Sequence, residues 1–195
     1  MLHKANIKKL ANLARDWRLG ISTRGTAATT RAGGVFYASV NYDDTIEVLR
    51  RLELRPSDVF IDVGAGKGRV LCLAAQNPLR KAIGIECSPD LVAVARENLR
   101  TLKNRKAPAE IFFQPAEEFD YSSATALYFF NPFEAEILDI VLRKIESDRR
   151  GRPLRLAFVM ESPAQRQVFA AHTWLERYAN WIDGSGHPVT FYRAR

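Results

Sequence analysis

The chain has 195 residues, of which 47% are hydrophobic and 26% are charged. This is the size and composition of one globular domain with a full core, and it excludes wholesale disorder. Its apolar runs fall far short of the roughly 18 residues that a membrane span requires, so we expect no membrane partner. Two cysteines, Cys72 and Cys87, are too few for a disulfide framework, and no Cys/His cluster has metal-ligand spacing. We therefore expect a reducing, cytoplasmic setting and no metal site.

The net charge of +7 is concentrated at the N-terminus. Residues 1–31 contain seven lysines and arginines but a single acid, Asp16, whereas the rest of the chain is almost neutral. The first predicted element is a helix whose apolar residues recur at three- and four-residue spacing, namely Ile7, Leu10, Ala14 and Trp17. Three interpretations stay open: a helix packed on the body with a solvated basic face, a site for an anionic partner such as nucleic acid, or an organelle-targeting segment.

A stretch rich in glycine and hydroxyl residues follows over 20–34, which predicts a long surface loop. Residues 42–54 then show helical spacing, and Pro56 ends that helix. We therefore predict a basic helical arm and lid-like segment over 1–57, followed by a core of 58–195.

In the core, short apolar runs alternate with helical patterns. The predicted strands are 58–63, 81–86, 109–114, 124–130 and 154–160; the predicted helices are 68–76, 88–102 and 133–145. Ser88 and Pro89 have the residue types of an N-cap and a first helical position. Residues 174–183 and 188–193 predict a closing hairpin, and the whole pattern favours one three-layer α/β sheet.

The most informative stretch is Asp62-Val63-Gly64-Ala65-Gly66-Lys67-Gly68, which lies where the first strand turns into the first core helix. Open α/β sheets bind nucleotides at this place, and glycines there allow positive φ and close approach of a ligand. The spacing is neither G-x-G-x-x-G nor that of a P-loop. Asp62 would repel a pyrophosphate, yet it suits a cofactor that carries a sulfonium, an α-amino group and an adenosine.

Glu86 ends the second strand, 20 positions after Gly66. An acidic residue at about this distance accepts hydrogen bonds from ribose hydroxyls in dinucleotide-binding folds. A carboxylate can accept from both hydroxyls of a vicinal diol, so we predict that Glu86 binds a ribose.

The glycine loop resembles motif I of the class I S-adenosylmethionine-dependent methyltransferases, and Ile83-Gly84-Ile85-Glu86 resembles their next, acidic motif. The resemblance spans about 58–160, and the hairpin fits the family's last two strands. It implies a Rossmann-like seven-stranded methyltransferase sheet flanked by helices, with an N-terminal helical extension. It also implies S-adenosyl-L-methionine as cofactor and S-adenosyl-L-homocysteine as product. The cofactor would lie against Asp62, Gly64, Ala65, Gly66, Lys67, Gly68, Glu86 and Cys87.

Two further features bear on the cofactor. Tyr42-Asp43-Asp44-Thr45 resembles a segment of the non-SET histone lysine methyltransferases that closes over the cofactor, which implies a contact from Tyr42. The arm together with the glycine loop also resembles small bacterial methyltransferases of unassigned substrate. Many family members have an acid after the third strand; here Gln114, Glu117 or the backbone of Ala116 would have to contact the adenine.

On the acceptor side, Phe129-Phe130-Asn131-Pro132-Phe133 resembles the (Asn/Asp)-Pro-Pro-(Tyr/Phe) motif of amino methyltransferases, with one proline fewer. The resemblance implies that Asn131 also lies beside the cofactor and accepts hydrogen bonds from the target nitrogen, while Phe133 packs on the acceptor. A second interpretation is that Asn131 caps the following helix, since asparagine does this well and a proline follows it.

These motifs predict an S-adenosylmethionine-dependent methyltransferase that methylates a nitrogen of a protein or nucleic acid by in-line transfer, with a small-molecule acceptor also open. The alternative is a catalytically inactive cofactor-binding module with a nucleic-acid-binding or regulatory role. A nicotinamide-dependent oxidoreductase is disfavoured by the glycine spacing.

Overall fold

The computed structural model describes residues 4–25 and 40–195. Most of the loop predicted over 20–34 therefore lies outside the described residues. The helices are α1 (Lys4–Leu19), α2 (Tyr42–Arg51), α3 (Arg69–Ala75), α4 (Pro89–Thr101), α5 (Ala135–Arg149) and α6 (Pro163–Ala171). The strands are β1 (Val59–Val63), β2 (Lys81–Glu86), β3 (Ala109–Phe113), β4 (Ala126–Phe130), β5 (Arg155–Val159), β6 (Leu175–Ile182) and β7 (Pro188–Ala194).

The seven strands form one sheet in the order β3-β2-β1-β4-β5-β7-β6. The first five strands are parallel, and β7 pairs antiparallel with both β5 and β6, so the predicted closing hairpin is confirmed. The chain order reverses direction between β1 and β4, which is where open α/β sheets form their binding sites. The predicted Rossmann-like, seven-stranded architecture is confirmed.

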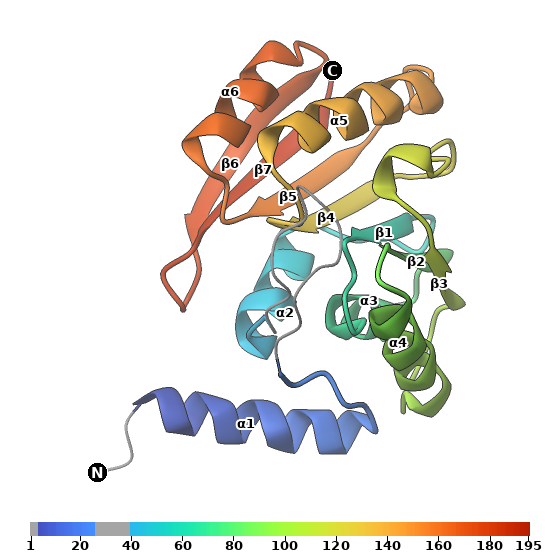
Figure 1. The fold of residues 1–195 in the computed structure, drawn as a ribbon, viewed down its shortest axis with the longest axis vertical. Helices are drawn as coiled ribbons and strands as arrows, with labels where there is room; N and C mark the ends of the chain where they lie inside the picture. The colour runs from blue at the N-terminus through green and yellow to red at the C-terminus, as the bar shows by residue number, and fades with distance from the viewer. Residues whose placement is uncertain (1–3, 26–39) are drawn as a thin grey trace.

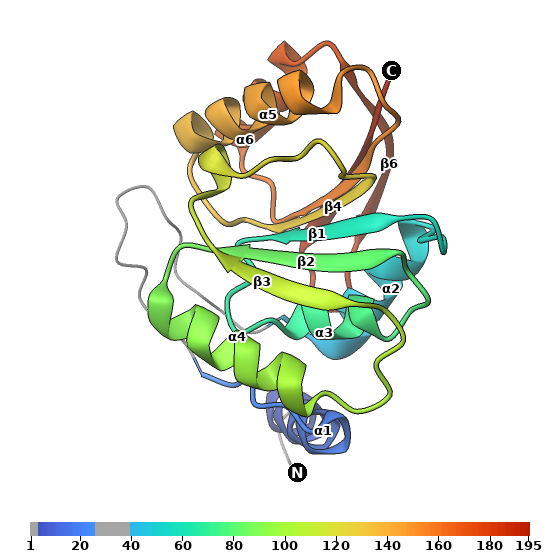
Figure 2. The ribbon, with the colours of Figure 1, turned by 90° about the vertical axis from the view of Figure 1, so that its right-hand side faces the viewer.

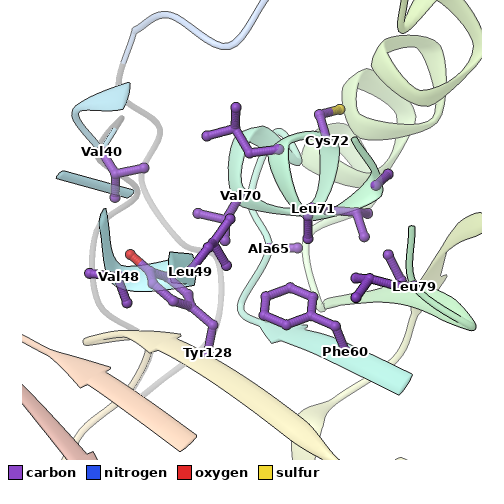
Figure 3. Packing of buried hydrophobic residues seen from close by; sticks show 14 of the residues in the cluster. Val40, Val48, Leu49, Phe60, Ala65, Val70, Leu71, Cys72, Leu79 and Tyr128 are labelled. Atoms are coloured by element: carbon purple, nitrogen blue, oxygen red, sulfur yellow. The ribbon is translucent and has the colours of Figure 1, made fainter. Parts of the chain in front are cut away.

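Helices cover both faces of this sheet, which is why β1 is buried along its whole length. Figure 2 shows α5 and α6 on one side and α2, α3 and α4 on the other. On the second side, Val48 and Leu49 of α2 and Val70 of α3 pack around Phe60 and Tyr128 of the sheet (Figure 3). The segment before β1 therefore contributes to the same core as the sheet.

One helix, α6, was not expected from the sequence. Ser162 caps it by accepting from the Gln165 N–H, and the Gln165 side chain accepts from the Ser162 N–H in return, which is a capping box. The Ser-x-x-Gln spacing followed by Pro163 at the first helical position was the available signal.

One predicted helix start needs correction, whereas the predicted N-cap position of Ser88 is confirmed. Helix α5 begins at Ala135 after Glu134 as N-cap, so Asn131 does not cap it. Ser88 occupies the N-cap position of α4, but its side chain makes no capping hydrogen bond. Its backbone N–H instead donates to the Glu86 carboxylate, which belongs to the site described below.

Helix α1 does not pack on the body through its apolar stripe. Leu10 and Trp17 are 56% and 79% exposed, whereas the buried residues of the helix include Asp16 and Leu19. The interpretation of a stripe packed on the body is wrong, because hydrogen bonds of Asp16 orient the helix with its apolar residues outward. Within the described ranges, no helix is long and apolar enough to cross a membrane.

Candidate active site

The glycine loop leaves β1 in a left-handed backbone conformation that only glycine adopts without strain. The φ angles of Gly64, Gly66 and Gly68 are 76°, 54° and 79°. A Cβ on Gly64 would lie only 2.6 Å from the Cβ of Pro132, and one on Gly68 would lie 3.2 Å from that of Ala95. The loop is therefore packed tightly between the end of β4 and helix α4.

Glu86 holds this loop in place from the end of β2. Its Oε2 accepts a hydrogen bond from the Gly66 N–H at 2.9 Å. Its Oε1 accepts from the N–H groups of Cys87 and Ser88, both also at 2.9 Å. A carboxylate has about four acceptor positions, so the three bonds leave room for one more donor. Glu86 thus joins the glycine loop to the start of the segment that leads into α4.

Asp62 lies beneath the loop on β1 and is 2% exposed. Its Oδ2 accepts from the Leu71 N–H at 3.1 Å. Burial, opposed by the Leu71 hydrogen bond and assisted by the nearby Glu86 charge, raises the pKa of this carboxyl to about 8. A cation above the loop would favour the ionised form of Asp62.

The start of the chain is attached to the loop through Asn98 and Lys67. The buried Asn98 carboxamide accepts from the Ser22 N–H at 2.7 Å and donates to the carbonyls of Ser22 and Lys67 at 3.1 and 2.8 Å. The Lys67 ammonium donates to the carbonyl of Arg24. Residues 22–24 consequently run beside the glycine loop, to which they are linked through the Asn98 carboxamide and the Lys67 ammonium.

Arg69 forms a second attachment, and it is 3% exposed. Its guanidinium donates to Thr23 Oγ1 at 2.7 Å and to the Val40 carbonyl, and lies 3.5 Å from Asp16 Oδ1. It also lies over the Tyr42 ring, 4.4 Å from the centroid. These contacts bring both ends of the segment between residues 25 and 40 to the start of α3.

Tyr42 belongs to this attachment and is 1% exposed. Its hydroxyl donates to Asp16 Oδ1 at 2.5 Å, and burial together with that bond raises the pKa of the phenol. The predicted cofactor contact needs correction, because the Tyr42 side chain has no surface to offer to a cofactor. Asp16, Asn98 and Arg69 were missed; the only signal for Asp16 was its position as the single acid in a basic arm.

The predicted adenine-side residues come together beyond the ends of β2 and β3. Cys87 and Ala116 are partly buried there, and the Gln114 N–H donates to the Glu86 carbonyl at 3.1 Å. The Gln114 carboxamide donates to the Glu118 carbonyl at 2.9 Å, and the Ala116 carbonyl accepts from the Tyr121 hydroxyl at 2.9 Å. The side chain of Gln114 therefore turns toward the short 3₁₀ helix Ala116–Glu118.

Asn131 lies at the end of β4 with a φ of 39°, and it is partly buried. Its Oδ1 accepts from Gln165 Nε2 at 2.8 Å, and the same Gln165 amino group donates to the Phe133 carbonyl at 2.8 Å. Since Pro132 touches the glycine loop, Asn131 lies next to that loop. Gln165, which is 3% exposed, was missed because it comes from the unforeseen helix α6.

Phe133 does not lie with Asn131 at the surface of the site. Its ring is 7% exposed and packs edge-to-face on Phe129, with 6.2 Å between the ring centroids, in the core beneath α5. This corrects the expectation that the Phe133 ring packs on an acceptor, since the ring faces the core.

Comparison with known proteins shows which proteins this chain is similar to. The family model described as "Histone methylation protein DOT1" matches residues 30–125, just under half of the chain. The H3 lysine-79-specific histone-lysine N-methyltransferase of Caenorhabditis elegans is 40% identical over 53 residues, 27% of this chain and 6% of that protein. An uncharacterised methyltransferase of Schizosaccharomyces pombe is 35% identical over 81 residues, 39% of this chain and 30% of that protein. These matches span less than a third of either relative's length.

Among solved structures, an RNA methyltransferase of Salinibacter ruber in complex with S-adenosyl-L-homocysteine has the same fold. The two share 23% identity with a TM-score of 0.60 over 80% of this chain and 94% of that one. The sheet order, the glycine loop held by an acidic residue at the end of β2, and the family-model match agree with one another. The chain thus has the fold of the class I S-adenosylmethionine-dependent methyltransferases, and over residues 30–125 it is similar to the DOT1 family model.

Proposed function

We propose that the protein transfers a methyl group from S-adenosyl-L-methionine to a nitrogen of a protein acceptor, with a lysine side chain as the substrate group. The observation that carries the proposal is one arrangement of two residues. Glu86 fixes the left-handed glycine loop, and the Asn131 carboxamide lies beside that loop at the end of β4.

The cofactor would bind along the carboxyl edge of β1 and β2. The backbone of Gly64, Gly66 and Gly68 would contact the methionine portion, and the remaining acceptor position of Glu86 would take a ribose hydroxyl. Asp62 fits this assignment, because a cationic group above the loop would offset the cost of ionising this buried carboxyl, whose pKa is otherwise raised. The adenine would lie near Cys87, with Gln114 and the backbone of Ala116 as its neighbours.

The cofactor supplies an electrophilic methyl group on a sulfonium. In-line transfer of such a group depends mainly on positioning and needs no obligatory acid–base pair. Gln165 holds the Asn131 carboxamide through Oδ1, and that oxygen keeps a second lone pair for an N–H of the acceptor. Asn131 would thereby hold the nitrogen lone pair in line with the methyl group.

A lysine acceptor is supported by the similarity to the DOT1 family model and to the histone lysine methyltransferase from Caenorhabditis elegans. The match covers the segment before β1 and the strands β1 to β3, which are the parts that would hold the cofactor in this proposal. We also place the protein in the cytoplasm, in agreement with its two free cysteines, Cys72 and Cys87.

The first test is calorimetry with S-adenosylhomocysteine, with NAD as the control ligand. We expect binding of the first ligand alone. Tritiated S-adenosylmethionine is then incubated with separated protein and RNA fractions, and labelled protein is hydrolysed to identify methyllysine. Label confined to RNA would overturn the acceptor class, and absence of S-adenosylhomocysteine binding would overturn the site.

The residue assignment has its own test in Asn131→Ala. Because the carboxamide would position the acceptor and not the cofactor, we expect about a 100-fold loss of turnover with little change in S-adenosylhomocysteine affinity. Glu110→Gln is the matched control, since Glu110 lies on β3 and pairs with Lys81 at the surface. Unchanged turnover in Asn131→Ala would remove this residue from the acceptor site.

A further inference from the structure

Helix α1 presents an apolar face to solvent. Trp17, Leu10 and Leu13 are 79%, 56% and 37% exposed, and Ala14 between them is also exposed. These positions are three or four residues apart, so they lie on one side of the helix. The opposite side carries the buried Asp16 and contacts the body. A contiguous exposed apolar face of this kind indicates an interaction surface.

The position of α1 leaves this face open. In Figures 1 and 2 the helix lies at the lower boundary of the molecule, below α4, and no described element lies beyond it. The chain after α1 is bonded to the end of α4 through the Lys103 N–H and the Leu19 carbonyl, at 2.9 Å. The helix is thus held on its inner side, and its outer side can lie flat on a planar surface.

The charges around the face are basic. Arg18 is exposed next to Trp17, and the ammonium of Lys103 lies 5.9 Å from the centroid of the Trp17 ring. The helix sequence also holds Lys4, Lys8 and Lys9, whereas Arg15 pairs with Asp43 of α2. Its single acid, Asp16, is buried and bonded. A second copy of this chain would bring like charges together, so the charge favours an anionic partner over self-association.

The apolar residues decide which anionic partner fits. Nucleic acid would use the cations and the Trp17 ring, but it offers no apolar phase for Leu10 and Leu13. A helix with leucine and tryptophan on one face and lysine and arginine around it is typical of segments that lie in the interface of an anionic bilayer. Lysine and arginine beside such a face can keep their charge at the headgroups while their stems lie along the apolar surface.

We infer that α1 is a peripheral membrane-binding helix that inserts Leu10, Leu13 and Trp17 into the interface of a bilayer containing anionic lipids. This departs from the expectation of no membrane partner, because the sequence pattern indicated an apolar stripe and could not show that the stripe faces outward. The inference does not depend on the proposed methyl transfer, and its test uses binding alone.

The experiment is flotation of the full-length protein with vesicles of phosphatidylcholine alone or of phosphatidylcholine and phosphatidylglycerol. We expect binding only to the anionic vesicles, weakened at high salt, and a blue shift of tryptophan fluorescence on binding. Leu13→Gln combined with Trp17→Gln should reduce partitioning at least about tenfold, since both lost side chains would be inserted. Arg18→Gln alone should reduce it about fivefold.

Ile140→Gln is the matched control, because Ile140 is 52% exposed on α5, on the other side of the sheet. This variant should bind as the native chain does, and thermal unfolding should be unchanged in all variants. An equal loss of vesicle binding in Ile140→Gln would overturn the inference. Equal binding of the native chain to neutral and anionic vesicles would also overturn it. Binding to RNA in the absence of vesicle binding, or a stable dimer that Trp17→Gln dissolves, would assign the face to another partner.

Discussion

Replacing Glu86 tests both the architecture and the chemistry of the site. Its carboxylate accepts three backbone hydrogen bonds, one from Gly66 in the loop and two from Cys87 and Ser88 after β2. Glu86→Ala removes the acceptor of all three N–H groups and the group that we assign to the ribose. Glu86→Gln keeps one oxygen, but its amide would turn a donor toward one of these N–H groups.

The expected loss of stability follows from these contacts. A hydrogen bond to a charged group contributes about 1.5–3 kcal/mol, and water entering the vacated space would recover part of that for each N–H. We therefore expect Glu86→Ala to lower the free energy of unfolding by about 3 kcal/mol, which for a chain of this length lowers Tm by about 6–12 °C. Glu86→Gln should lower the free energy of unfolding by about half as much.

Cofactor affinity should fall in parallel. Loss of the ribose acceptor and of the fixed loop should weaken S-adenosylhomocysteine binding by about 2–3 kcal/mol, or roughly 30- to 150-fold. Calorimetry at a temperature where each variant is folded measures this, with Glu110→Gln on β3 as the exposed acidic control. If folded Glu86→Ala binds S-adenosylhomocysteine with native affinity, the ribose assignment is refuted. If its Tm is native, Glu86 does not stabilise the loop.

The other predictions concern the loop and the acceptor residue. The pKa of Asp62 is about 8, above its ordinary value of 3.8, so the native state holds a proton that the unfolded chain releases, and stability falls as pH rises between these values. In Asp62→Asn the free energy of unfolding, measured by denaturant titration, should change less steeply with pH, by up to about 1.4 kcal/mol per pH unit. An unchanged pH dependence would contradict the raised pKa of Asp62. Gly64→Ala places a methyl against Pro132 at positive φ and should cost about 2–4 kcal/mol of stability and abolish S-adenosylhomocysteine binding, whereas normal binding would contradict the loop assignment. Gln165→Met removes the donor to Asn131; it should lower turnover about tenfold with native cofactor affinity, and turnover equal to the native value would show that Asn131 needs no positioning.

Local sequence patterns were sufficient to predict the strands of the sheet. The five parallel strands and the hairpin were predicted to within about two residues, because each is a short apolar run bounded by glycine, proline or polar residues. The glycine loop and Glu86 were predicted because their spacing along the chain reflects strand–turn–helix geometry, which is local. The helix α6 was missed although its capping box was present in the sequence.

Contacts between residues far apart in the sequence decided the orientation of α1 and the partners of the buried polar side chains. The stripe of α1 has the spacing of a packed face, yet Asp16 is bonded to Thr23 and Tyr42 and turns that face outward. Nothing in the sequence pairs Arg69 with Asp16, 53 residues away, or Gln165 with Asn131, 34 residues away.

The sequence by itself determined the fold class and the position of the glycine loop, because hydrophobic periodicity and glycine conformation act over a few residues. Only the tertiary structure decided that Tyr42 and Phe133 are buried and that Asn131 is held by a glutamine instead of capping a helix. A side chain's partner depends on which elements meet, and that is settled by the packing of the whole chain.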